Sequence, residues 1–122
     1  MAKDDYFVIV CKALLYFYGC LKREVCFSNV YFVDMVKKDI EEQYFLDVLR
    51  MMSDEGYIEG YRYAKDFGRD VIMLSKYEAI RITQKGIEYL QENYMMKKAK
   101  KLLVENRDKI VDLIFAMKAN VF

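Results

Sequence analysis

The chain has 122 residues, 55% of them hydrophobic, which is enough for one domain with a single core and excludes an intrinsically disordered protein. Its 20 basic and 19 acidic residues give a formal net charge of +1, so it lacks the clear basic excess of a dedicated DNA-binding domain. The absence of histidine excludes Ser-His-Asp and Cys-His nucleophile systems, HExxH zinc sites and Cys₂His₂ zinc fingers.

The remaining composition favours a helical intracellular protein. Proline is absent and glycine occurs five times, which favours long helices over an all-β fold with many turns. The three cysteines, Cys11, Cys20 and Cys26, are odd in number and form no CxxC pair. We expect them to be reduced thiols of a cytoplasmic protein, with Cys11 in the core.

The first predicted element is a helix over residues 4–18, capped by Asp4 or Asp5 and ended by Gly19. It contains an almost wholly apolar run, residues 6–18, which is interrupted only by Lys12. This run is shorter than the roughly 20 residues that a membrane span needs, and the acids before it do not suit a signal peptide. We therefore expect a buried helix and no membrane association.

A connector over residues 20–28 follows, with a short strand expected around Val25. Ser28 or Asn29 can cap a short second helix over residues 30–36.

The third helix has the clearest pattern and is predicted over residues 40–55. Asp39 is the expected N-cap, with Glu42 three residues later as in a capping box. Gly56 is expected to end the helix. One apolar face is formed by Ile40, Tyr44, Phe45, Val48, Leu49 and Met52.

Two strands and a fourth helix are predicted next. A strand over residues 57–65, a turn over 66–70 with Gly68 available for positive φ, and a return strand over 71–82 with a break near Lys76 would form a β-hairpin. Thr83 can cap a fourth helix that runs to about residue 94. Because Gly86 in its first turn costs helix stability, we expect it to permit close packing against the hairpin or the third helix.

The predicted fold class is α+β and mostly helical: a winged helix, meaning a helix-turn-helix plus a β-hairpin wing, over residues 1–94, with a C-terminal helical extension over residues 95–122. The extension has more apolar surface than one helix needs to cover a small domain, so we expect a homodimer. The alternative is that the extension folds back on the first helix of its own chain. The predicted dimer seam consists of Leu103, Ile110, Ile114 and Met117.

Two segments carry a family resemblance. Residues 49–60 read LRMMSDEGYIEG and residues 82–93 read ITQKGIEYLQEN, and a lysine-rich segment follows at residues 96–99. With these segments the chain resembles the YjcQ family, small bacterial proteins of winged-helix fold, some of which occur in phage-like gene sets. The resemblance is sharpest over residues 40–100. It implies a winged helix and a DNA-binding-like module, and it implies no reaction.

The charges bear on whether this module binds DNA. A winged helix normally lays its third helix in the major groove of DNA. Residues 1–93 have a net charge of −3 and residues 94–122 a net charge of +4. The side chains of the third helix that are expected to face outward are Glu41, Glu42, Gln43, Leu46, Asp47, Arg50, Ser53 and Asp54. They include four acids and one arginine, so phosphates repel this face as a whole.

Two hypotheses therefore stay open: a transcription-regulator-like module that binds double-stranded DNA, or a winged-helix scaffold for a protein partner without DNA binding. A continuous basic stripe formed by the lysines of residues 97–101 with Arg62 and Arg69 would favour DNA. The candidate nucleic-acid contacts are Lys37, Lys38, Gln43, Arg50, Arg62, Lys65, Arg69, Lys97, Lys98 and Lys101.

We expect no enzymatic activity. Adjacent carboxylates such as those of Glu41 and Glu42 lie at a helix start, where capping explains them better than acid–base catalysis. The chain has no glycine-rich phosphate loop and no metal-loop spacing of acids. We therefore predict no catalytic, cofactor-binding or metal-binding residues.

Overall fold

A computed structural model describes residues 5–112 of the chain. Its helices are α1 (Asp5–Leu21), α2 (Asn29–Phe32), α3 (Glu42–Asp54), α4 (Gln84–Glu92) and α5 (Tyr94–Glu105), and α2 continues into a π-helical turn, η1 (Val33–Lys37). The strands are β1 (Ile58–Glu59), β2 (Tyr63–Lys65), β3 (Val71–Met73) and β4 (Arg81–Ile82), with a 3₁₀ turn, η2 (Tyr77–Ala79), between the last two. The predicted α+β, mostly helical class is confirmed.

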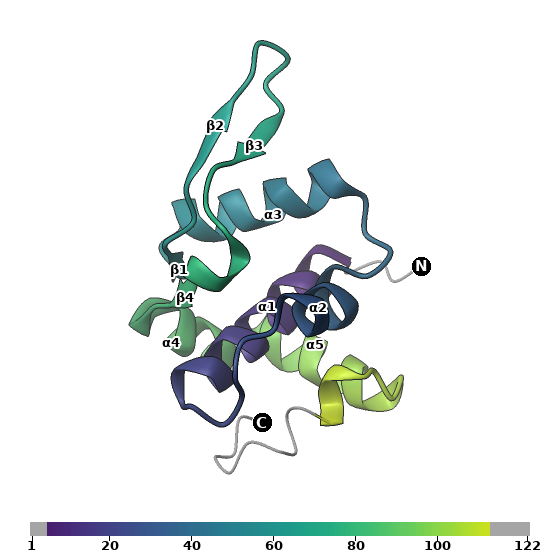
Figure 1. The fold of residues 1–122 in the computed structure, drawn as a ribbon. Helices are drawn as coiled ribbons and strands as arrows, with labels where there is room; N and C mark the ends of the chain where they lie inside the picture. Colours follow the sequence, from purple (N-terminus) through teal and green to yellow (C-terminus); the bar gives the residue numbers. More distant parts are fainter. Residues whose placement is uncertain (1–4, 113–122) are drawn as a thin grey trace.

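The four strands form one interrupted antiparallel hairpin. At its base β1 pairs with β4, with Ile58 opposite Ile82, and further out β2 pairs with β3, with Tyr63 opposite Met73. The β2–β3 hairpin, which with its flanking residues spans 62–74 and is called the wing below, projects past α3 (Figure 1). Three helical segments, a hairpin and a further helix, in this order, are compatible with the predicted winged helix.

Helix α1 forms the centre of the core. It packs against α3, α4, α5, η1 and β4, so neighbours cover it on nearly every side (Figure 1). Residues 9–17 are all buried, including Lys12, whose Nζ lies 3.3 Å from a carboxylate oxygen of Asp108. This burial explains why the sequence of α1 has no polar face.

The ends of α1 and its connector differ from the prediction. The helix continues past Gly19 to Leu21, and Arg23 takes the left-handed conformation, with φ of 60°. The N–H of Glu24 closes the turn on the carbonyl of Gly19 at 3.1 Å. No strand forms near Val25, so both predictions for this segment were wrong. Ser28 caps α2 as expected, because its hydroxyl accepts the N–H of Tyr31.

Helix α3 begins later than predicted. The carboxylate of Glu41, not of Asp39, accepts the N–H of Tyr44 at 2.9 Å, and this hydrogen bond lowers the pKa of Glu41. Leu46, predicted to face outward, is only 5% exposed. The chain after α3 folds back over it, and the hydroxyl of Tyr61 donates to the Leu46 carbonyl at 3.0 Å.

The helix ends and turns near the hairpin follow the predictions more closely. Gly56 ends α3 with φ of 84°, and the Thr83 hydroxyl caps α4 by accepting the N–H of Gly86 at 3.0 Å. The predicted break in the return strand is the turn η2. In the wing turn, Arg69 and not Gly68 takes positive φ, because the Asp66 carboxylate accepts the N–H of Asp70 and fixes the loop.

Buried tyrosines predict how stability depends on alkaline pH. Burial raises the pKa of Tyr77 and Tyr89 from 10.0 to about 12 and raises that of Tyr61 as well. Since these phenols ionise more readily in the unfolded chain, the stability they contribute is complete below pH 10 and is lost as pH rises from 10 through 12. Urea unfolding across this range should show the loss. In Y77F the loss of stability with rising pH should be shallower. If the phenolate absorbance of the folded protein showed every tyrosine titrating near pH 10, the prediction would be contradicted.

Candidate interaction face of α3 and the wing

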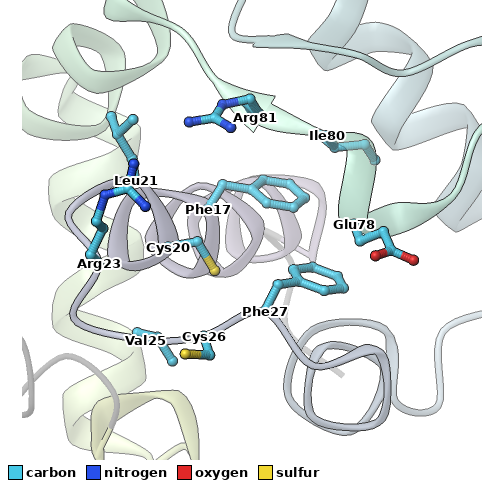
Figure 2. Close-up of a pocket in the computed structure, with 10 residues that line it drawn as sticks. All are labelled: Phe17, Cys20, Leu21, Arg23, Val25, Cys26, Phe27, Glu78, Ile80 and Arg81. Atoms are coloured by element: carbon cyan, nitrogen blue, oxygen red, sulfur yellow. The ribbon is translucent and has the colours of Figure 1, made fainter.

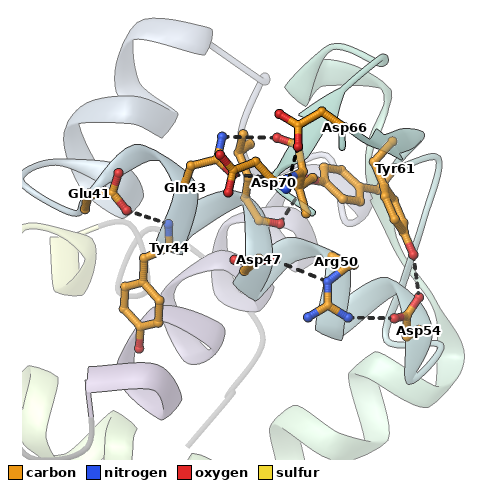
Figure 3. A network of polar contacts seen from close by, with 12 residues as sticks. Glu41, Gln43, Tyr44, Asp47, Arg50, Asp54, Tyr61, Asp66 and Asp70 are labelled. Atoms are coloured by element: carbon orange, nitrogen blue, oxygen red, sulfur yellow. Dashed lines mark hydrogen bonds and ion pairs between the residues drawn. The ribbon is translucent and has the colours of Figure 1, made fainter. Parts of the chain in front are cut away.

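The exposed side chains of α3 and of the wing, together called the α3–wing face, include several candidate contacts (Figure 3). Gln43 fastens α3 to the wing: its amide nitrogen donates to the Val71 carbonyl at 3.2 Å, and its amide oxygen accepts the Val71 N–H at 3.1 Å. Both ends of this amide are therefore occupied within the chain. In this arrangement Gln43 cannot make the bidentate contact with adenine that a base-reading glutamine makes.

Arg50 is also engaged within the chain. Its Nε donates to Asp47 at 3.4 Å and its Nη1 to Asp54 at 3.0 Å (Figure 3). The hydroxyl of Tyr63 on β2 donates to the other carboxylate oxygen of Asp54 at 3.0 Å. The only basic residue of α3 thus lies between two carboxylates, which neutralise its charge toward an approaching phosphate.

The start of α3 adds further negative charge to this face. Lys37 pairs with Glu42 at 2.8 Å, while Lys38 is exposed in the preceding turn with φ of 41°. Residues 41–55 hold five carboxylates and one arginine, a net charge of −4. The α3 half of the α3–wing face is therefore acidic.

The wing carries the basic half of the face. Arg62, Lys65 and Arg69 are all exposed, and Phe67 at the turn is fully exposed. Asp66 and Asp70 also lie in this turn, so the excess of positive charge on the wing is small.

The lysines of α5 do not extend this basic surface. Lys97, Lys98 and Lys101 are exposed on α5, which packs against α1 and α4 at the opposite end of the molecule from the wing (Figure 1). Lys100 is 2% exposed, and this burial lowers its pKa. The basic stripe that would have favoured DNA binding is not formed.

Two residues of the predicted dimer seam are buried within the chain. Leu103 and Ile110 are 3% and 0% exposed, and α5 packs along α1. For these two side chains the burial favours the folded-back alternative. Ile114 and Met117 lie outside the described residues. The homodimer stays a prediction.

A pocket that the sequence did not predict lies at the C-terminal end of α3. It has a volume of about 310 Å³, and the rings of Tyr57 and Tyr89 stack in its wall with centroids 4.1 Å apart. Burial raises the pKa of Tyr89 to about 12, with smaller contributions from Tyr57, Tyr6 and Glu55. We call it the aromatic pocket; it is lined by Tyr6, Phe7, Arg50, Met51, Asp54, Glu55, Tyr57 and Tyr89.

The aromatic pocket could not be predicted because it joins the start of α1, the end of α3 and the middle of α4. Its one local signal is the tyrosine that follows the Gly56 turn. Across residues 5–112, no three cysteines or acids are grouped closely enough to hold a metal ion. No helix within the same range is long and apolar enough to cross a membrane.

Comparison with known proteins assigns the chain to a family. No curated protein and no solved structure matches it at a significant level. The sequence model of the family described as YjcQ protein matches residues 14–109, which include all of α2 to α5 and the hairpin. The match covers most of the chain and agrees with the resemblance of residues 40–100, so this chain belongs to the YjcQ protein family.

Proposed function

We propose that this chain is a non-enzymatic, cytoplasmic winged-helix protein that binds a basic segment of a protein partner at the acidic end of α3. The observation that carries the proposal is the aromatic pocket, where Asp54 and Glu55 adjoin four aromatic side chains. Ring faces carry negative partial charge and attract a lysine or arginine side chain, and the carboxylate of Glu55 adds to that attraction, whereas that of Asp54 is already paired with Arg50. The pocket therefore offers a cation both an apolar wall and a counter-charge.

The same charges oppose the usual docking of a winged helix on DNA. The third helix would have to enter the major groove with a net charge of −4 over residues 41–55. Of the two candidate nucleic-acid contacts on this helix, Gln43 is bonded to Val71 and Arg50 to Asp47 and Asp54. Bringing this helix to phosphates would cost electrostatic energy, and neither Gln43 nor Arg50 is free to offset it.

Two titrations of the full chain at about 20 mM salt test the proposal. One uses a hexa-arginine peptide and the other a mixed-sequence DNA duplex. We expect the peptide to bind and the duplex not to bind. The variant E55K should weaken peptide binding about fivefold, because it reverses a charge at the aromatic pocket. E24K is the matched control: it makes the same charge change beyond the other end of α1 and should leave binding nearly unchanged.

Two results would overturn the proposal. Equal weakening by E55K and E24K would show attraction to overall charge alone, without use of the aromatic pocket. Duplex binding that exceeds peptide binding would reject it in favour of the DNA hypothesis.

A second candidate function, binding of double-stranded DNA, is favoured by one observation: Arg62, Lys65 and Arg69 are all exposed on a projecting hairpin. On this candidate the wing contacts the phosphate backbone and α3 stays outside the groove. Affinity should then fall with salt, with a log–log slope of about −0.9 for each phosphate neutralised. The variant R62Q/K65Q should reduce that slope, and an unchanged slope would exclude the wing.

A further inference from the structure

A second and larger pocket lies at the other end of α1. It has a volume of about 500 Å³ and is enclosed by the last turn of α1, the connector to α2, and the segment from η2 to β4 (Figure 2). Leu21, Val25 and Phe27 supply its accessible apolar surface, since Phe17 and Ile80 are only 2% and 4% exposed. We call it the α1–η2 pocket. Its volume falls in the range of small-molecule sites.

Two arginines line this pocket without a partner in the described part of the chain. Arg23 and Arg81 both line it, and Figure 2 shows both guanidinium groups on the side away from Glu78. Within residues 5–112 neither guanidinium forms a hydrogen bond or an ion pair, although Arg81 stands opposite Glu59 in the β1–β4 register. Two cations that form no ion pair within the described residues thus line one pocket.

A defined turn holds the backbone of Arg23. Its φ of 60° lies in the left-handed region, which costs free energy for a residue with a Cβ. The turn that imposes this conformation is closed by the hydrogen bond from the Glu24 N–H to the Gly19 carbonyl. A left-handed residue after the last turn is a common way for a helix to end, and this turn fixes the position of the Arg23 backbone beside the pocket.

The other polar groups of the pocket do not cancel this positive charge. Burial, and to a lesser degree Cys26, raises the pKa of the Cys20 thiol to about 11, so Cys20 is uncharged at neutral pH. Among the described residues that line it, Glu78 supplies the one carboxylate, against two guanidinium groups. The pocket therefore has a net positive charge at one side and an apolar floor.

We infer that the α1–η2 pocket binds a small carboxylic acid with an apolar body, the carboxylate contacting Arg23 and Arg81 and the hydrocarbon lying on Leu21, Val25 and Phe27. The planar fork of a guanidinium group matches a carboxylate in geometry and charge. Hydrocarbon placed on the accessible apolar atoms of these side chains adds the hydrophobic contribution that a bare anion lacks. This site is separate from the aromatic pocket and goes beyond the proposed function.

The test uses sodium octanoate as the probe and two matched compounds, octan-1-ol with the same chain and no charge, and propionate with the same charge and little chain. Binding is measured by calorimetry and by the rate at which a maleimide labels Cys20 and Cys26, with the buried Cys11 as internal reference. Octanoate should bind and slow labelling of both thiols. Octanol and propionate should bind at least about tenfold more weakly.

Variants separate the arginines from general charge. R23Q and R81Q should each weaken octanoate binding about tenfold, since each removes a charge-assisted hydrogen bond. R62Q on the wing removes the same charge outside the pocket and should have no effect. Arg23 and Arg81 are exposed, so both variants should fold, which circular dichroism checks. Absence of octanoate binding at millimolar concentration, equal binding of octanol, or unchanged affinity in R23Q and R81Q would each overturn the inference.

Discussion

Replacing Phe32 by alanine should lower the free energy of unfolding by about 3–5 kcal/mol, the range for a large aromatic side chain removed from a core. Phe32 is 0% exposed although it lies in a helix of only four residues. Its ring packs against aromatic rings that come from four different segments of the chain. The ring centroids lie 5.4 Å from Tyr16, 5.3 Å from Phe17, 5.5 Å from Phe27, 6.1 Å from Phe45 and 5.0 Å from Tyr77.

This loss is large because Phe32 joins α1, the connector, α3 and η2. No local hydrogen bond of α2 can compensate, since a helix of four residues is not stable without tertiary packing. A loss of this size is a large fraction of the roughly 5–15 kcal/mol that stabilises a typical domain. Urea unfolding followed by circular dichroism measures it.

The matched control is F67A. Phe67 is the same residue type and is fully exposed at the tip of the wing, so its removal should change stability by less than about 0.5 kcal/mol. A loss below about 1 kcal/mol for F32A would show that the aromatic cluster around Phe32 is not packed as described.

The parts of the fold that could be predicted from the sequence are those fixed by local rules. Three such features depend only on neighbours a few positions away: the helix end at Gly56 after an amphipathic run, the helix cap at Thr83 three residues before Gly86, and the turn near Lys76. The structure has all three where the sequence places them. The N-cap at Glu41 was missed because Asp39 two residues earlier satisfies the same local pattern.

The candidate site depends on contacts between distant residues, and it could not be predicted in the same way. Gln43 looks like an outward residue of α3 until Val71, 28 positions later, is placed beside it. Leu46 also follows the outward pattern, and only the returning chain at Tyr61 buries it. Both pockets join segments from opposite parts of the sequence. The sequence could predict the acidic composition of α3 but not which of its side chains are already engaged.

Replacing Gly86 by alanine should lower the free energy of unfolding by about 1–3 kcal/mol, the range for an overpacked core position. Helix propensity alone predicts the opposite sign, because alanine in a helix is favoured over glycine by about 1 kcal/mol. A Cβ on Gly86, however, would overlap the carbonyl oxygen of Tyr57 and press on Cγ1 of Ile82. A backbone carbonyl cannot turn aside as a side chain can, so the overlap outweighs the propensity.

The carbonyl that would be displaced also holds the junction between the hairpin and α4. It accepts the N–H of Thr83 at 3.1 Å, and the Thr83 hydroxyl donates to the Gly56 carbonyl at 2.5 Å while capping α4. Moving it therefore weakens the exit of α3, the base of the hairpin and the start of α4 together. Thermal and urea unfolding of G86A should show this loss of stability. G68A is the control, because a Cβ there would lie 3.4 Å from an oxygen of the Asp66 side chain and Gly68 does not have positive φ. G68A should stay within about 0.5 kcal/mol of the parent, whereas a G86A protein as stable as the parent would mean that α4 does not approach Tyr57 this closely.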